Sequence, residues 1–274
     1  MTEEAALRSR VLSALVFVPV ALALTIVGGW ALELALLALV AAAAREMSVL
    51  LTRIGLRAPA GSWLFAPIAF LAALHLPAAA PLYVAGWIVW GGATLWLFFP
   101  WRPRAPRNGL LGSIGHAAGL LYVAVLPAFL FRLAASPAGD DSRGLLLALL
   151  ATWACDSGAY AAGFTFRGPR LWPTVSPGKT WAGAGGGLVA SILVTLLLGP
   201  RWFPSLPTLE AALLGAAVGC LGPLGDLFES RLKRVAGVKD TGVFLPGHGG
   251  VLDRFDSLLY VAPVFGLLLV RLAR

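Results

Sequence analysis

The segment from residue 207 to residue 256 joins an apolar stretch of membrane-spanning length to a polar stretch rich in charged residues and glycine. Its first part, PTLEAALLGAAVGCLGPLG (207–225), is apolar and of membrane-spanning length, and DLFE (226–229) joins it to SRLKRVAGVKDTGVFLPGHGGVLDRFD (230–256). The last stretch holds six basic residues, counting His248, with three aspartates and five glycines. Because buried charges need partners, such a cluster beside a membrane span is typical of a functional site. Its composition favours phosphate groups and a divalent cation as ligands.

The apolar pattern recurs along all 274 residues, of which 59% are hydrophobic. A mean hydropathy of +0.84 excludes a typical soluble domain. Runs that cross a bilayer need roughly 17–25 residues, and nine candidates lie near 11–29, 31–51, 62–80, 82–99, 110–132, 145–165, 182–199, 207–225 and 251–270. The sequence therefore predicts an all-α, polytopic integral membrane protein with about nine transmembrane helices.

Two regions are expected. The Pro- and Arg-rich stretch 100–108 separates motif-poor transmembrane helices (1–109) from a polar-studded transmembrane region (110–274) in which the motifs gather. The first apolar run, 11–29, exceeds the core of a signal peptide, about 7–15 residues, so we expect it to be retained as a helix.

The distribution of positive charge predicts the orientation in the membrane. Of the 21 Lys and Arg residues, 16 lie at the N-terminus or after the even-numbered spans. The positive-inside rule then places the N-terminus and the loops after the even-numbered spans in the cytoplasm. An odd number of helices sends the C-terminus outside, in conflict with Arg271 and Arg274.

Two polar groups accompany the predicted spans 145–165 and 182–199. Asp156 and Tyr160, in DSGAY, are four residues apart and share a helix face near the inner end of their span. An ionisable residue there indicates function, with a helix cap or an arginine pair as the alternative. SPGKT (176–180) opens the next span and favours phosphate binding at a helix N-terminus. The alternative is a capped helix with a lysine reaching to the interface, and no glycine begins a nucleotide-binding P-loop here.

Two more groups follow the apolar run 207–225. Asp226, Glu229 and Lys233 recur at helical spacing on one stripe, which is either functional or a solvated face. Beyond them lie KD (239–240), PGHGG (246–250) and DRFD (253–256), where glycines let backbone amides surround an anion. Carboxylate oxygens of this kind suit Mg²⁺, which takes one or two protein carboxylates together with phosphates and water.

These residues resemble a known family. The pattern S-x-x-K-R-x4-K-D-x-G-x2-L-P-G-H-G-G-x-x-D-R-x-D, met from Ser230 to Asp256, is similar to the signature of phosphatidate cytidylyltransferases, also called CDP-diacylglycerol synthases. The DSGAY and SPGKTW elements resemble that family too, in the same order. The motifs span about residues 152–256. The resemblance thus implies that 110–274 is a transmembrane catalytic region in the cytoplasmic (inner) membrane, with the active site at the cytoplasmic ends of the C-terminal helices. The resemblance implies transfer of CMP from CTP to phosphatidic acid, with Mg²⁺ as cofactor, CTP and phosphatidic acid as partners, no nucleic acid, and a homodimer.

The resemblance also implies roles for single residues. Asp226 and Asp253 become the metal ligands. The catalytic set is Asp226, Asp253, Lys179, Lys233, Arg234, His248 and Asp156. The substrate-binding set is Ser176, Lys179, Thr180, Ser230, Lys233, Arg234, Lys239, Asp240, His248, Gly249, Gly250, Arg254 and Asp256. One position departs from the family, which commonly has K-T-x-E-G where this chain has KTWAG (179–183), so that Ala182 removes a carboxylate.

The chemistry is consistent with this assignment. A phosphate monoester has a second pKa of about 6, so the nucleophile is already ionised near neutrality and needs no general base. We therefore expect His248 to donate a hydrogen bond or to act structurally. A CTP-dependent polyprenol kinase, which releases CDP, and a cation transporter are the alternatives. A transporter predicts internal repeats and charges near the bilayer midplane, whereas the sequence has no repeat and gathers its charges on one side.

Overall fold

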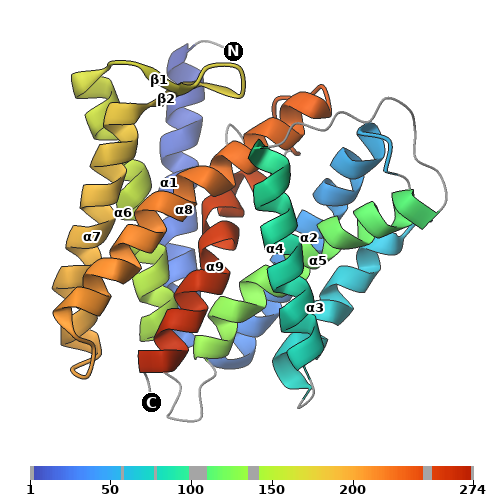
Figure 1. The fold of residues 1–274 in the computed structure, drawn as a ribbon, viewed down its shortest axis with the longest axis horizontal. Helices are drawn as coiled ribbons and strands as arrows, with labels where there is room; N and C mark the ends of the chain where they lie inside the picture. Colours follow the sequence, from blue (N-terminus) through green and yellow to red (C-terminus); the bar gives the residue numbers. More distant parts are fainter. Residues whose placement is uncertain are drawn as a thin grey trace. The chain divides into compact units, whose positions relative to one another are not determined.

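The computed structural model describes residues 3–56, 59–76, 79–98, 110–134, 142–242 and 249–272. Over these residues nine α-helices follow one another, with a short 3₁₀ helix and one β-hairpin (Figure 1). The helices are α1 (Glu3–Val27), α2 (Gly29–Arg53), α3 (Phe65–His75), α4 (Ala80–Phe98), α5 (Leu110–Ala134), α6 (Arg143–Phe166), α7 (Trp181–Trp202), α8 (Thr208–Val235) and α9 (Leu252–Leu272). The 3₁₀ helix η1 covers Ser62–Leu64.

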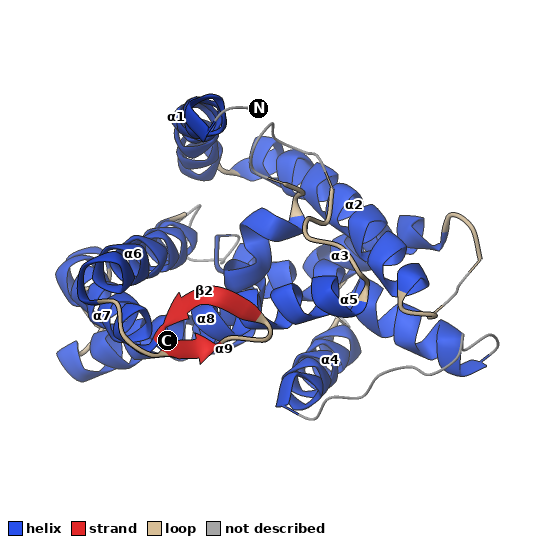
Figure 2. Ribbon diagram, turned by 90° about the horizontal axis from the view of Figure 1, so that it is seen from above, coloured by secondary structure: helices blue, strands red, loops and turns tan. Residues whose placement is uncertain are grey.

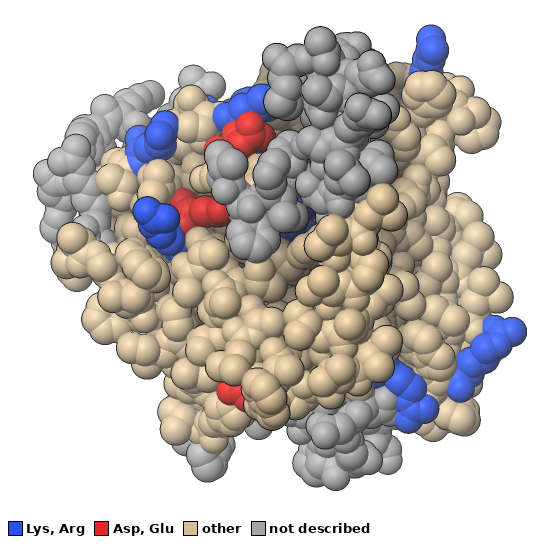
Figure 3. Space-filling model, turned by 180° about the vertical axis from the view of Figure 1, so that it is seen from behind, with Lys and Arg blue, Asp and Glu red and all other residues tan. Residues whose placement is uncertain are grey.

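Six of these helices are long and apolar enough to cross a membrane, judged over the residues whose side chains are described. They are α2, α4, the Gly112–Phe131 part of α5, α6, α7 and α8. The face drawn in Figure 3 is covered mostly by residues that are neither basic nor acidic, as expected of a surface in contact with lipid. These findings agree with an all-α membrane protein, while the number of nine spans stays a prediction.

The predicted span 62–80 is shorter in the structure. The apolar helix ends at His75, and Ser62–His75 covers only 14 residues, which at about 1.5 Å per residue does not cross a hydrocarbon core of about 30 Å. Leu76 is extended, with ψ 129°, because the residue before a proline avoids helical geometry and Pro77 follows in the sequence.

The chain is also not purely helical. Arg170–Trp172 (β1) and Ser176–Thr180 (β2) form an antiparallel hairpin between α6 and α7, and it is the only sheet among the described residues (Figure 2). SPGKT is therefore a strand that leads into α7 rather than the first turn of that helix. Thr180 is the N-cap, because its hydroxyl oxygen accepts the Gly183 N–H at 3.0 Å.

The chain forms two compact units. Unit 1 comprises Met1–Ala128 with Leu232–Phe255, and unit 2 comprises Phe129–Arg231 with Asp256–Arg274. In unit 1 the core is formed by α2 side chains such as Met47 and Leu50, with Phe70 of α3 and Leu126 of α5. The predicted division of function after residue 109 stays a prediction.

A buried histidine fastens α5 to the end of α2 in unit 1. His116 of α5 is 1% exposed, and its Nδ1 donates to the Leu56 carbonyl at 3.1 Å. Its Nε2 lies 3.1 Å from the Ser48 hydroxyl of α2 and 3.2 Å from the Ser62 hydroxyl. Burial of a polar ring requires such partners, and these hydrogen bonds link α5 to the C-terminal part of α2.

Glycine determines the packing of unit 2. On α7 the buried residues Gly183, Gly187, Ser191, Thr195 and Gly199 recur every four positions and form one small-residue face. A Cβ atom at Gly187 would lie 2.8 Å from the Cys155 carbonyl oxygen of α6, and one at Gly219 of α8 would lie 2.6 Å from the Leu188 Cα atom of α7. Two glycine pairs with GxxxG spacing, 183/187 and 215/219, therefore let these helices pack closely.

Neighbouring glycines of α7 are expected to respond oppositely to substitution. Gly186→Ala should lower the melting temperature in detergent, because the new Cβ would overlap Ala162 and approach the Gly158 carbonyl oxygen to 2.7 Å. Such overpacking typically destabilises by about 1–3 kcal/mol. Gly185→Ala is the control, since a Cβ there meets nothing within 4 Å and alanine favours the helix by about 1 kcal/mol. Equal melting temperatures for the two variants would contradict the α6–α7 contact.

Candidate functional site

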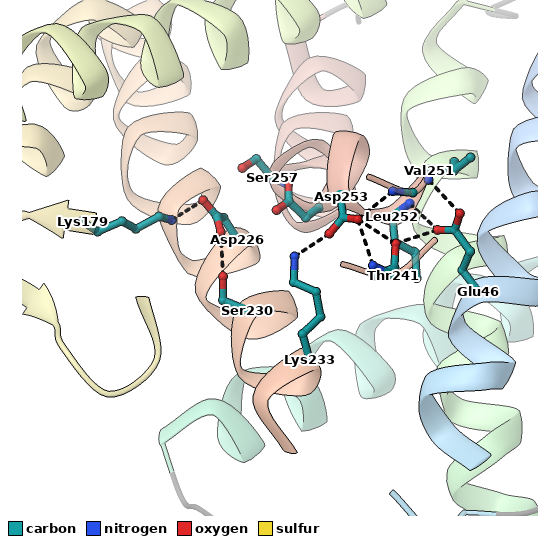
Figure 4. Close-up of polar contacts among 12 residues, drawn as sticks. Glu46, Lys179, Asp226, Ser230, Lys233, Thr241, Val251, Leu252, Asp253 and Ser257 are labelled. Atoms are coloured by element: carbon teal, nitrogen blue, oxygen red, sulfur yellow. Dashed lines mark hydrogen bonds and ion pairs between the residues drawn. The ribbon is translucent and has the colours of Figure 1, made fainter. Parts of the chain in front are cut away.

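In unit 1, the carboxylate of Asp253 accepts hydrogen bonds from three residues. Asp253 is the second residue of α9, and its Oδ1 lies 2.5 Å from Lys233 Nζ of α8. Its Oδ2 accepts the Thr241 N–H at 3.0 Å, the Thr241 hydroxyl at 2.9 Å and the Gly250 N–H at 2.7 Å. The side chains of Asp253 and Lys233 are 6% and 13% exposed. Figure 4 shows Glu46, Lys233, Thr241 and Asp253, which together with Gly250 we define as the Asp253 cluster.

Local sequence explains this geometry. α8 ends because Gly237 takes a left-handed conformation (φ 70°) and Val238 N–H donates to the Lys233 carbonyl. Just before α9, Gly249 has φ 76°, and a Cβ there would lie 2.5 Å from Asp253 Oδ2. A Cβ at Gly250 would overlap the Thr241 hydroxyl and the Glu46 carboxylate. Both glycines are therefore required for the backbone to approach the carboxylates.

In unit 2, a second aspartate is paired with a second lysine. The Oδ2 atom of Asp226, on α8, lies 2.7 Å from the Nζ atom of Lys179, on β2 (Figure 4). Asp226 also accepts a hydrogen bond from the Ser230 hydroxyl at 3.1 Å. Lys179 also donates to the Pro223 carbonyl at 3.1 Å. The side chains of Lys179 and Asp226 are 23% and 38% exposed, so solvent or a ligand can reach this pair.

Two other predicted acids belong to the surroundings of this pair. Asp256 of α9 interacts through its charge with Asp226, Lys179 and Asp156 of α6, and it accepts the Ser257 N–H at 2.6 Å. Asp156 is exposed and lies within α6, which continues for ten more residues to Phe166. Asp226, Asp256 and Asp156 thus place carboxyl groups, the oxygen donors that a hard cation uses, around Lys179.

The remaining predicted residues are less closely tied to either aspartate. Arg234, Lys239, Asp240 and Arg254 are exposed, Ser176 is half-buried in β2, and Thr180 is buried as the cap of α7. Their roles in binding stay predictions. His248 lies outside the described residues.

The structure adds a residue that the sequence motifs did not include. Glu46 of α2 accepts hydrogen bonds from Val251 N–H and Leu252 N–H, both at 3.0 Å, and from the Thr241 hydroxyl at 2.8 Å. The available signal was an acidic residue inside the predicted span 31–51, since ionisable residues in spans often mark functional sites. Thr241 had no signal of its own apart from lying within the quoted segment.

The donor chemistry fits a hard divalent cation with few protein ligands. The described residues include no group of three or more His, Cys, Asp or Glu side chains that could hold a metal by themselves. Mg²⁺ does not need such a cage, because it commonly uses one or two carboxylates and completes its shell with phosphates and water. Asp226 and Asp253 present carboxylates of the required type.

Comparison with known proteins identifies the family. The model of the cytidylyltransferase family matches residues 8–272. The phosphatidate cytidylyltransferase of Staphylococcus epidermidis (strain RP62A) is 43% identical over 132 residues, which are 48% of this chain and 51% of that protein. Proteins of the same name from Staphylococcus saprophyticus (41% over 128 residues, 47% and 49%) and Staphylococcus aureus strain COL (44% over 129 residues, 46% and 49%) are also similar. The chain spans about half the length of the curated relatives it matches. With a family match over residues 8–272, the chain belongs to the cytidylyltransferase family.

Proposed function

We propose that this chain is a phosphatidate cytidylyltransferase, which transfers CMP from CTP to phosphatidic acid and yields CDP-diacylglycerol and pyrophosphate. The name of the similar staphylococcal proteins supports the substrates, and six apolar helices suit a lipid substrate. The observation that carries the proposal is that two aspartates of the family motif are each paired with a lysine, at 2.5 Å and 2.7 Å. Carboxylates for a cation and ammonium groups for phosphates thus occur together in both units.

In the proposed reaction, an oxygen of the lipid phosphate attacks the α-phosphorus of CTP. The bond from that phosphorus to the bridging oxygen breaks, and pyrophosphate leaves with the electron pair. Because the nucleophile is already an anion, the protein has to position two polyanions and offset their charge rather than remove a proton. His248 therefore acts as a hydrogen-bond donor in this scheme.

Lys179 and Lys233 supply the mobile positive charge. Each is bound to an aspartate in the ligand-free chain, and each is a flexible point charge that can turn toward a phosphate oxygen. Asp226 and Asp253 would hold Mg²⁺, which when bound supplies positive charge at the phosphate oxygens. Asp156 and Asp256 belong to the same polar surroundings of Asp226 and Lys179. Placement in the cytoplasmic membrane with the site facing the cytoplasm, and a homodimer, belong to the same proposal.

The test follows two phosphorus atoms of CTP in mixed micelles with phosphatidic acid and Mg²⁺. We expect label from the α-phosphate in the lipid extract as CDP-diacylglycerol and label from the γ-phosphate in pyrophosphate. Diacylglycerol, which lacks the attacking phosphate, is the control and should give no product. Transfer of the γ-label to a polyprenol would instead indicate a kinase, and movement of cations across vesicles without any nucleotide product would indicate a transporter.

A further inference from the structure

Glu46 connects the motif-poor helix α2 to the start of α9 within unit 1. Its Oε1 accepts the Val251 N–H and its Oε2 the Leu252 N–H, each at 3.0 Å. The two donor residues are buried, with 1% exposure each. The first N–H groups of a helix have no partner within the helix, and a carboxylate satisfies them and interacts favourably with the helix dipole. Glu46 thus caps α9 from a residue 206 positions away in the chain.

The same carboxylate reaches Asp253 through one hydroxyl group. Thr241 Oγ1 lies 2.8 Å from Glu46 Oε2 and 2.9 Å from Asp253 Oδ2. A hydroxyl has one proton to donate, so the two carboxylates share it, and neither can shift without changing the hydrogen bond of the other.

The surrounding backbone leaves little room for another arrangement. A Cβ at Gly250 would overlap both Thr241 Oγ1 and Glu46 Oε2, and one at Gly242 would lie 2.6 Å from Glu46 Oε1. The chain passes both glycines close to the carboxylate of Glu46, on either side of residues 243–248.

We infer that Glu46 is a positioning residue for the nucleotidyl transfer: it orients Asp253 by fixing Thr241 and the N-terminus of α9. The inference rests on the proposed function, because Asp253 has its catalytic role only there. It gives α2, in the region predicted to carry no motif, a direct part in the geometry of the site. Partners that orient a functional carboxylate are typically worth about 10–100-fold in activity or metal affinity.

The test compares Glu46→Gln with Glu33→Gln on the same helix. Glu33 is a matched control, because it is also a paired carboxylate of α2, bound to His75 at 2.6 Å. In Glu46→Gln one acceptor oxygen becomes an N–H₂ donor, so a contact to Leu252 and Thr241 or to Val251 is lost while the shape is kept. We expect kcat per folded molecule to fall by about 10–100-fold with little change in KM for CTP, whereas Glu33→Gln should resemble the unchanged protein.

A double-variant cycle separates positioning from general stability. Thr241→Val removes the hydroxyl that the two carboxylates share. If Glu46 acts through that hydroxyl, the double variant Glu46→Gln/Thr241→Val should lose no more activity than the worse of the two single variants. Thr241→Ser, which keeps the hydroxyl, should recover most of the loss seen in Thr241→Val. Losses that multiply, or a Glu46→Gln variant that merely yields less folded protein of unchanged kcat, would overturn the inference.

A second readout needs neither metal nor substrate. Amide hydrogen exchange of the metal-free protein should be faster over residues 250–253 in Glu46→Gln and unchanged there in Glu33→Gln. The unchanged protein could form no CDP-diacylglycerol while exchange is still faster in Glu46→Gln than in Glu33→Gln. The proposed function would then fail, but the role of Glu46 in positioning Asp253 would stand. Equal exchange in the two variants would overturn that role itself, whatever the activity.

Discussion

Asp253→Asn is expected to reduce CDP-diacylglycerol formation by about 10³-fold or more. A bound divalent cation contributes several kcal/mol of charge stabilisation in such transfers, and about 4 kcal/mol corresponds to 10³ in rate. The neutral amide loses one anionic oxygen, and the positive charge of Lys233, 2.5 Å from Oδ1, is left without its counter-charge.

The donors around Asp253 make this substitution more damaging than a loss of charge alone. Its Oδ2 faces the Thr241 N–H, the Thr241 hydroxyl and the Gly250 N–H, and its Oδ1 faces an ammonium group. An asparagine N–H₂ in either orientation would point a donor at donors. We therefore expect a lower melting temperature in addition to the lost activity.

The measurement is the initial rate with labelled CTP at saturating phosphatidic acid, beside thermal melting in the same detergent. Glu33→Gln is the charge-matched control in unit 1 and should keep both rate and melting temperature. An Asp253→Asn variant with more than about a tenth of the original kcat, a loss under about 1.4 kcal/mol, would exclude Asp253 as an essential ligand.

Asp226→Asn should lose about 10²-fold or more in rate while keeping its fold, which makes it the cleaner test of charge. Asp226 is 38% exposed, and an asparagine oxygen can still accept the Ser230 hydroxyl. Lys179 keeps its hydrogen bond to the Pro223 carbonyl at 3.1 Å. The expected loss thus reflects the missing anionic oxygen at the phosphates and not a broken helix contact.

The readout is kcat and KM for CTP over a series of Mg²⁺ concentrations. A ligand role predicts that the variant requires more Mg²⁺ for half-maximal rate. Glu210→Gln, which removes an acidic side chain from the first turn of the same helix, is the control and should follow the unchanged protein. An identical Mg²⁺ dependence for Asp226→Asn would assign Asp226 to packing or to the placement of Lys179.

Periodicity and composition predicted most of the fold, because long apolar runs have few alternatives to helices in a membrane. The boundaries were harder to predict where local chemistry decides them. The apolar run 62–80 contains Pro77, whose effect on Leu76 ends the helix early. SPGKT reads as a helix start, yet pairing with Arg170–Trp172 makes it a strand, and such pairing depends on a partner that local sequence does not specify.

The candidate site, like the fold, could be predicted from the sequence only in part. The motif residues Lys179, Asp226, Lys233 and Asp253 follow from the resemblance to the family, but the pairing of each lysine with one aspartate needs coordinates. Glu46 lies about 200 residues before its partners and has no motif around it. A contact over that distance in the chain has no periodic signature, so only the folded structure could identify it.

The hairpin before α7 has a consequence for chimeras and for length variation among relatives. Lys179 stands between the paired residue Ser176, opposite Trp172, and the helix cap Thr180, opposite Arg170. Inserting or deleting one residue between them would turn the lysine to the opposite face of the strand or uncap α7. A graft of this hairpin from a relative that keeps the count from Ser176 to Thr180 therefore keeps Lys179 at its place between the paired residues.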